Sequence, residues 1–378
     1  MRKANSSDII FIIMFVFIIL FPTVDKLIGI TLAVESHEKR ALAKMPSLAE
    51  VDLPDYIDGM DRYYTDNFGG RNLFIKLFCW IKLNIYSSSP FPEQVVIGQD
   101  GWTFLGESKG SIYSEHLGVK VYNKNLLNRS KNNILDHKNW LEDQGIDYYL
   151  FVAPDKYSIY PEQLPSHFDD RHNHLNLNRF IKHMKPELSV IDAREELIAR
   201  KSEMPTYGRT DSHWTQFGAF IGYKKLIERI RKDYPGVGAP KRLSDFSVKL
   251  APSEHKDMAH LIHAKEAMPD IETVFTPKGR VGFRKVKSQL KLPRGFKSDP
   301  RTYEMRYKSK NAGNGLKILV FRDSFSNKLM SFLPYNFSEI IFISNNHKFD
   351  KNIIKKEQPD IVLHEIVERN IREVFRRY

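Results

Sequence analysis

The chain has 378 residues, 42% of them hydrophobic and 12% aromatic, which is typical of a folded protein and excludes a largely disordered one. A single cysteine excludes any intrachain disulfide, so the fold must depend on packing. The formal net charge of +12 indicates an anionic partner, either nucleic acid, an anionic membrane surface or an acidic polymer.

An apolar run over residues 9–21 follows two basic residues and ends at Pro22 and Asp25. As a helix it spans about 20 Å, less than the roughly 30 Å of a bilayer core, and the residues after it bring it to borderline length. A secretory signal, an uncleaved anchor and a buried core helix are the alternatives. Because the run has no polar face and no well-formed cleavage site, we favour a signal anchor over residues 1–34. The basic residues before it place the remaining chain outside the cytoplasm, which argues against nucleic acid as the partner.

Residues 35–125 are predicted to form an N-terminal region of helices and one hairpin. The helices are expected within residues 35–90. Two short apolar runs at residues 95–105 surround Asp100 and Gly101, and this pattern is typical of a β-hairpin.

From residue 126 to residue 378 short apolar runs alternate with helical segments, which predicts an α/β fold with a parallel sheet flanked by helices. A helix is expected at residues 125–144, and another from an N-cap at Thr215 to about residue 232. The alternation is lost over residues 235–315, which indicates an insertion of loops and short strands. The expected strands are residues 147–153, 188–193, 316–321, 339–343 and 360–364.

Positive charge is concentrated in one part of this insertion. Residues 278–310 contain twelve basic residues and only two acidic ones, Asp299 and Glu304. Such a segment is either a solvated insertion or a track for a polyanion. The basic residues are Lys278, Arg280, Arg284, Lys285, Lys287, Lys291, Arg294, Lys297, Arg301, Arg306, Lys308 and Lys310.

Ser324 follows the predicted strand at residues 316–321 by a few residues. A serine in a strand–turn–helix arrangement stands at the carboxyl edge of the sheet, where backbone N–H groups can hold an oxyanion. The same position also suits a residue that only caps a helix, as does its neighbour Asp323.

Asp211 and His213 supply the remaining parts of a serine acyl-transfer site. In an extended segment, residues two apart point to the same face, so the carboxylate of Asp211 can bind one imidazole nitrogen while the other faces a nucleophile. The alternative is a surface loop in which Asp211 caps the helix that begins near Thr215.

Two other candidate sites, a histidine metal site and a cysteine nucleophile, have less support in the sequence than the serine site. The histidines His255, His260 and His263 are spaced five and three residues apart, which matches no common metal-ligand pattern, so we predict no metal. Cys79 lies in an apolar run without an activating group nearby, and we interpret it as a small buried hydrophobe rather than a catalytic thiol.

Six short motifs occur in a fixed order and together carry a family resemblance. They lie at residues 63–71, 96–105, 153–156, 211–215, 322–325 and 359–369. In this order the chain resembles the SGNH-hydrolase-like polysaccharide O-acetyltransferases of the alginate acetylation family, over residues 40–370. The N-terminal anchor is similar to that of family members that face the periplasm.

The resemblance implies an SGNH-hydrolase-like sheet and a role for individual residues. Ser324 corresponds to the acyl-accepting serine, His213 to the general base and Asp211 to the residue that orients the base. Arg322 stands where a Gly-Asp-Ser pattern has glycine, and it is expected to constrain the turn or to contact acetyl or polysaccharide. The resemblance also places Lys156 and Tyr157 on the substrate side.

The function that the resemblance implies is O-acetylation of an exported polysaccharide, acidic in view of the positive charge, by a protein anchored in the inner membrane and facing the periplasm. A multispanning membrane acyltransferase is the expected acetyl source, and no cofactor is expected. An acetylesterase with the same three residues is one alternative. A non-catalytic polysaccharide-binding subunit of an export complex is the other. The pattern does not name the polysaccharide.

Overall fold

The computed structural model describes residues 5–31, 41–168, 175–296, 299–344 and 348–375. The chain divides into two compact units, the first formed by Met1–Phe91 with Ala259–Ala267 and the second by Pro92–Met258 with Met268–Tyr378. This division falls at residue 91, whereas the sequence pattern placed boundaries at residues 34 and 125.

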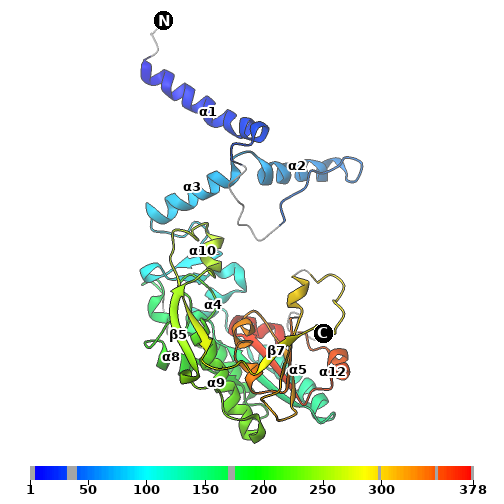
Figure 1. The fold of residues 1–378 in the computed structure, drawn as a ribbon. Helices are drawn as coiled ribbons and strands as arrows, with labels where there is room; N and C mark the ends of the chain where they lie inside the picture. The colour runs from blue at the N-terminus through cyan, green and yellow to red at the C-terminus, as the bar shows by residue number, and fades with distance from the viewer. Residues whose placement is uncertain (1–4, 32–40, 169–174, 297–298, 345–347, 376–378) are drawn as a thin grey trace. The chain divides into compact units, whose positions relative to one another are not determined.

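The first unit contains the helices α1 (Ser6–Ile28), α2 (Leu53–Asn67) and α3 (Arg71–Asn84) (Figure 1). The helix α1 has 23 residues and extends the predicted apolar run at both ends. It is long and apolar enough to cross a membrane, as judged by length and composition. The prediction of helices within residues 35–90 is confirmed for α2 and α3, while residues 41–52 are not helical and residues 32–40 lie outside the described part.

The second unit is built on a seven-stranded sheet in the order β4-β3-β11-β9-β10-β8-β7. The first five strands are parallel, and β8 and β7 are antiparallel to their neighbours. The strands are β3 (Asp147–Ala153), β4 (Ile191–Asp192), β7 (Phe283–Val286), β8 (Glu304–Ser309), β9 (Lys317–Phe321), β10 (Glu339–Ile343) and β11 (Ile361–Val367).

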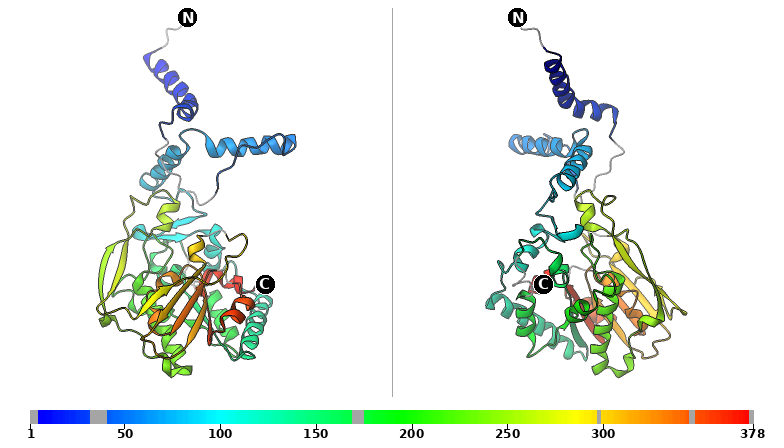
Figure 2. Two further views of the ribbon diagram at one scale, coloured as in Figure 1. Left: turned by 45° about the vertical axis from the view of Figure 1, so that its right-hand side comes forward. Right: turned by 90° about the vertical axis from the view of Figure 1, so that its left-hand side faces the viewer.

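Helices cover both faces of this sheet because its central strands are apolar on both sides (Figures 1 and 2). In β3, Phe151 and Ala153 point into one core, and Leu150 and Val152 point into the other. The first core contains the apolar face of α9, and the second contains those of α5, α7 and α12. The helices of this unit are α4 (Ile112–His116), α5 (Lys124–Glu142), α6 (Lys156–Ile159), α7 (Leu175–Met184), α8 (Arg194–Arg200), α9 (Gln216–Asp233), α11 (Ser326–Leu329) and α12 (Lys351–Glu357), while α10 (Asp257–Leu261) crosses the division between the units.

Two antiparallel ribbons complete the second unit. The strands β1 (Val95–Ile97) and β2 (Thr103–Leu105) confirm the predicted hairpin, and Asp100 and Gly101 take the positive φ angles that its turn requires, 50° and 75°. The strands β5 (Phe246–Pro252) and β6 (Ile271–Pro277) form the second ribbon.

The prediction of a parallel α/β sheet is confirmed for five of the seven strands, with corrections to the length of two of them. The strand expected at residues 188–193 is reduced to the two residues of β4, and β11 continues three residues beyond the predicted end at residue 364. The segment at residues 235–315 contains more regular structure than expected, since β7 and β8 join the sheet. The strands β7 and β8 are antiparallel to each other. A parallel pair would need a crossover connection, usually an α-helix, and the described residues between these strands form none.

Candidate active site

Ser324 lies in the turn between β9 and α11, at the carboxyl edge of the sheet, and is exposed. The carboxylate of Asp323 fixes this turn, because its two oxygens accept the N–H groups of Phe325 at 2.8 Å and Val367 at 2.7 Å. Since Val367 ends the neighbouring strand β11, the turn is tied to the middle of the sheet.

His213 reaches this turn from the segment that precedes α9. The next residue, Trp214, is fully buried, and its indole N–H donates to the carbonyl of Phe325 at 3.0 Å. Thr215 then caps α9 by accepting the Gly218 N–H at 3.2 Å, as predicted. The buried tryptophan and the cap therefore set the position of the imidazole beside the serine turn.

The three residues predicted as nucleophile, base and orienting acid form one hydrogen-bonded row. The Nε2 atom of His213 lies 2.8 Å from the hydroxyl of Ser324, and its Nδ1 atom lies 2.7 Å from Oδ1 of Asp211. The same Asp211 oxygen accepts the backbone N–H of His213 at 2.8 Å. With Nδ1–H donated to the carboxylate, Nε2 is left as the acceptor for the serine proton.

Asp211 is charged in this arrangement. Burial by itself raises the pKa of a carboxyl group, but the hydrogen bonds from His213 and its charge outweigh this and lower the pKa of Asp211 well below its ordinary value. A carboxylate that remains ionised can stabilise an imidazolium that forms beside it.

A second carboxylate, which the sequence did not single out, lies next to the imidazole. Asp257 Oδ2 is 3.7 Å from Nδ1 of His213 and accepts the hydroxyl of Ser212 at 2.6 Å. Its other oxygen accepts the Ser212 N–H at 2.7 Å, and its own N–H donates to Asp211 at 3.3 Å. Asp257 thus holds the backbone of the histidine segment and adds negative charge behind the ring.

The aromatic ring of Phe325 joins this row to a second group of charged side chains. Its centre lies 5.1 Å from that of the His213 ring and 5.3 Å from the guanidinium carbon of Arg369. Arg369 follows β11, and one of its N–H groups donates to Asp155, which follows β3. The carboxyl ends of β3, β9 and β11 therefore all contribute to the same edge of the sheet.

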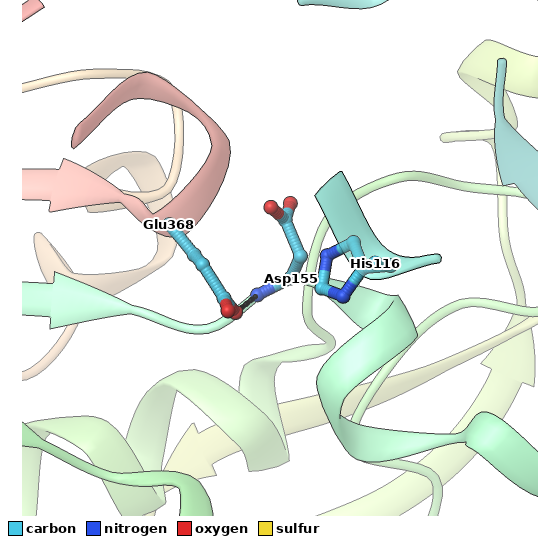
Figure 3. A group of neighbouring side chains, drawn as sticks. All are labelled: His116, Asp155 and Glu368. Atoms are coloured by element: carbon cyan, nitrogen blue, oxygen red, sulfur yellow. Dashed lines mark hydrogen bonds between the residues drawn. The ribbon is translucent and has the colours of Figure 1, made fainter. Parts of the chain in front are cut away.

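Asp155 belongs to a buried cluster with His116 and Glu368, which we call the polar cluster (Figure 3). The three side chains come from three elements, and Glu368 accepts the Asp155 N–H at 2.9 Å and the Ser158 hydroxyl at 2.7 Å. Burial is the main reason that the pKa of Glu368 is raised.

The polar cluster is one of two groups in the described chain whose ligand atoms all lie within 4.8 Å of one another, the other being Asp211, His213 and Asp257. Imidazole and carboxylate groups of this kind can bind zinc. In the polar cluster, however, Asp155 already binds the Arg369 guanidinium, which supplies positive charge. Neither group includes the three histidines His255, His260 and His263.

Residues 95–279 match the family model described as the SGNH hydrolase-like domain of the acetyltransferase AlgX. This match supports an SGNH hydrolase-like domain over these residues, similar to that of the alginate acetylation family. The matched stretch includes Asp211 and His213 and ends before Ser324.

Two curated relatives carry the name "Probable alginate O-acetylase AlgJ". The protein from Pseudomonas syringae pv. tomato is 23% identical over 228 residues, which are 60% of this chain and 56% of the relative. The protein from Pseudomonas fluorescens is 25% identical over 223 residues, 58% of this chain and 52% of the relative. The chain thus spans little more than half the length of these relatives.

Solved structures show the same fold at low sequence identity. Bacillus cereus PatB1 superposes with a TM-score of 0.54 at 19% identity, covering 75% of this chain and 98% of that one. The O-acetyltransferase domain of Pseudomonas putida AlgJ gives a TM-score of 0.51 at 17% identity, covering 74% and 92%.

Three further residues, which the family resemblance placed near substrate, are buried in this SGNH-like domain. The ammonium group of Lys156 donates to the carbonyls of Thr103 at 2.8 Å and Arg209 at 2.9 Å, and burial lowers its pKa to about 7. The hydroxyl of Tyr157 donates to the carbonyl of Leu105 at 2.7 Å. Both side chains therefore hold the β1–β2 hairpin in place, and a role toward substrate stays a prediction.

Arg322 is also buried, and it constrains the serine turn. Its guanidinium donates to the carbonyls of Asp323 at 3.1 Å and Thr302 at 2.8 Å and to the side chain of Asn327 at 2.8 Å. Of the two roles expected for Arg322, these contacts correspond to the constraint on the turn, and contact with a substrate stays a prediction.

Glu365 supports the serine turn from β11. It is fully buried, and its carboxyl accepts the Ser326 hydroxyl at 2.6 Å and the Asp323 N–H at 3.2 Å. Burial raises the pKa of Glu365 well above its ordinary value, and the charge of Asp323 adds to this effect. This shift favours the protonated, neutral form of Glu365.

Glu365→Gln is expected to make the stability of the protein less dependent on pH. Because the pKa of Glu365 is raised above 4.5 by folding, this group's contribution to stability falls as the pH rises, by at most about 1.4 kcal/mol per pH unit. Glutamine does not titrate, so the variant lacks this pH-dependent contribution. Free energies of unfolding in urea between pH 5 and pH 8 would measure the difference.

Glu142→Gln, at an exposed position on α5, is the matched control and is expected to follow the wild type. Parallel curves for the wild type and Glu365→Gln would show that Glu365 is ionised in the native protein. Glu365→Ala, which leaves the Ser326 hydroxyl and the Asp323 N–H without their acceptor, is expected to cost about 2–4 kcal/mol.

Proposed function

We propose that this protein is a serine O-acetyltransferase that moves acetyl groups to hydroxyls of an exported polysaccharide. The observation that carries the proposal is the row formed by Ser324, His213 and Asp211 at the carboxyl edge of an SGNH-like sheet. Serine, imidazole and carboxylate in this order are the groups that acyl transfer through a covalent intermediate requires.

In the first half-reaction Ser324 takes acetyl from a donor. Its hydroxyl proton moves to Nε2 of His213 as its oxygen attacks the acetyl carbonyl, and Asp211 stabilises the imidazolium. The N–H of Ser324 has no acceptor among the residues that the structure describes, whereas that of Phe325 is donated to Asp323. We assign the Ser324 N–H to the oxyanion. The donor's leaving group then departs with the proton from His213.

In the second half-reaction a sugar hydroxyl replaces the leaving group. His213 removes the hydroxyl proton as the sugar oxygen attacks the acetyl-serine, and it returns that proton to Ser324 when the ester bond to the serine breaks. Water in place of the sugar would make the protein an acetylesterase. The two activities differ only in which acceptor reaches the acetyl-serine.

We also propose where the reaction takes place and which partners supply and accept the acetyl group. The helix α1 anchors the protein in the inner membrane with its second unit in the periplasm, where an acidic polysaccharide passes during export. A multispanning membrane acyltransferase supplies acetyl from the other side of the bilayer. The exposed basic residues within 278–310 support an acidic acceptor.

The test supplies an activated aryl acetate as donor to the purified protein in detergent and measures where the acetyl group is found. We expect acetyl on the peptide that contains Ser324, and then on acidic oligosaccharides in preference to neutral ones of the same length. Free acetate as the main product at every oligosaccharide concentration would establish the esterase instead. No acetyl on Ser324 and no transfer would favour the binding subunit.

Asp257→Asn is expected to slow acetyl transfer by about 3- to 30-fold, because the variant removes a negative charge 3.7 Å from the Nδ1 of His213. The imidazolium then forms less readily, so the acid limb of the pH–rate profile is expected to move to lower pH. Initial rates of aryl acetate turnover between pH 5 and pH 9 provide the measurement.

Asp143→Asn, at an exposed position after α5, is the control and is expected to leave the profile unchanged. If Asp257→Asn lowers the rate equally at every pH, Asp257 acts only by holding Ser212. If the rate is unaffected, Asp257 neither stabilises the imidazolium nor positions the histidine segment for the reaction.

A further inference from the structure

The helix α3 carries an unusually apolar surface for a segment outside α1. Its exposed apolar side chains make up what we call the α3 stripe, and two residues directly after the helix extend it. The stripe consists of Leu73, Phe74, Leu77, Phe78 and Trp80, with exposed fractions of 37–55%, followed by Ile85 and Tyr86 at 63% and 67%. Exposed apolar groups of this size, contiguous along one helix, mark a binding surface more often than a water-facing one.

The stripe occupies one side of α3. Leu73, Leu77 and Trp80 follow one another at spacings of four and three residues, so they share a helical face. Cys79, on another side of the helix, is fully buried, and burial raises the pKa of its thiol to about 11. The helix is therefore covered on the Cys79 side and exposes the stripe on the other.

Contacts within the first unit fix the start of α3 against the end of α1. A carboxylate oxygen of Asp25 in α1 accepts the N–H of Gly70, the residue before α3, at 2.7 Å. At Gly69 a side-chain carbon would lie 2.1 Å from the carbonyl oxygen of Pro22, so only glycine allows this approach. The ring of Phe74 in α3 packs edge-on against that of Phe21 in α1, with the ring centres 5.7 Å apart.

These contacts set the depth of α3 relative to α1. Phe21 is the last residue of the apolar run, and Asp25 and Lys26 mark the point at which α1 becomes charged. In a membrane-spanning helix that point lies at the headgroups. Because Phe74 contacts Phe21, the first turn of α3 is held at the boundary between the headgroups and the acyl chains.

We propose that the α3 stripe lies in the interfacial layer of the lipid bilayer, beside the point at which α1 leaves it. This inference rests on the proposed anchoring role of α1. Trp80 and Tyr86 are residue types that prefer this layer. The helix also contains Arg71, Lys76 and Lys82 and no acidic residue, which suits anionic headgroups.

The lipid surface is a better fit to these observations than a partner protein. Continuity with α1 places the stripe where lipid is already present, and the cations of α3 match the charge of anionic lipid. Lys82 lies over the rings of Phe78 and Tyr86, at 5.9 Å and 5.6 Å, so its charge stays beside the stripe.

The test places a polarity-sensitive fluorophore at single cysteines in the full chain, in a Cys79→Ala background. The positions are Val16→Cys in α1, Trp80→Cys in the stripe and Val119→Cys, an exposed position in the second unit. The protein is reconstituted in vesicles of neutral and anionic phospholipid, with a quencher on the upper acyl chain. We expect quenching at positions 16 and 80, stronger at position 80 with anionic lipid, and none at position 119.

The three labels separate the possible failures. Quenching at position 16 without quenching at position 80 would overturn the inference while the anchor stands. A blue-shifted but unquenched label at position 80 would mean that protein, from this chain or a second copy, covers the stripe, and would also overturn it. An unquenched label at position 16 would refute the anchor itself.

Discussion

Ser324→Ala is expected to reduce acetyl transfer by about a thousandfold or more, because no acetyl-enzyme can form without the serine oxygen. The side chain is exposed, and its hydroxyl is bound only to His213 among the described residues. The stability of the variant should therefore match that of the wild type. Stopped-flow release of the aryl alcohol, with thermal unfolding of the same samples, measures both effects.

Ser331→Ala provides the matched control, since Ser331 is exposed a few residues beyond α11. It is expected to retain wild-type turnover. Equal rates for the wild type and Ser324→Ala would remove Ser324 from the mechanism, and the measured activity would then come from another group or from the buffer.

Arg306→Ala is expected to cost about 3–5 kcal/mol of folding free energy, the largest stability effect that we predict for a single side chain. Arg306 is 1% exposed, and its guanidinium binds the carboxylates of Glu304, Glu339 and Glu357 at distances of 2.7–3.0 Å. Truncation leaves buried negative charge without its partner. Urea unfolding at pH 7 measures the loss.

Lys308→Ala, two residues further along β8, tests whether the effect depends on burial. Lys308 is exposed and lies 3.5 Å from Glu339, so its loss should change stability by less than about 1 kcal/mol. Burial by itself raises the pKa of Glu357, but hydrogen bonds from Arg306 and Lys317 outweigh this and lower it. The stability that depends on this charge is lost as the pH falls through the lowered pKa, so the deficit of Arg306→Ala should shrink at acidic pH. A deficit that is independent of pH would point to lost packing rather than unpaired charge.

Local pattern identified the central residues of the site as candidates, and the family resemblance assigned their roles. Asp211 and His213 are two residues apart in an extended segment, and Ser324 follows an apolar strand, so the two halves depend on short-range geometry that the sequence displays. Whether the halves meet depends on strand order, which no local pattern contains. In the structure they meet at a distance of 2.8 Å.

The charged neighbours of the site could not be predicted in the same way. Asp257 comes from a segment in which the α/β alternation is lost, so nothing in the sequence placed it near His213. Asp155, by contrast, follows a predicted strand, and that position was a usable signal for the edge of the sheet. The strand was predicted to end at residue 364, which assigned Glu365 to a loop, whereas Glu365 belongs to β11 in the structure.

Burial was the property that sequence described least well. The family resemblance placed Lys156 and Tyr157 on the substrate side, and in the structure backbone carbonyls of the hairpin bind both buried side chains. Arg306 was counted within a basic segment, although buried glutamates neutralise it. The other basic residues described between 278 and 310 are exposed, and Lys297 lies outside the described residues.

The place of β11 in the sheet has a consequence for the order of folding. This strand lies between β3 and β9, although more than two hundred residues separate it from β3 along the chain and about forty from β9. Until residue 367 has been synthesised and, in an exported protein, translocated, β3 and β9 have no common neighbour and the serine turn lacks the Val367 N–H that fixes it. Incomplete chains therefore expose apolar strand edges, which makes them prone to aggregation and proteolysis before the candidate active site is assembled.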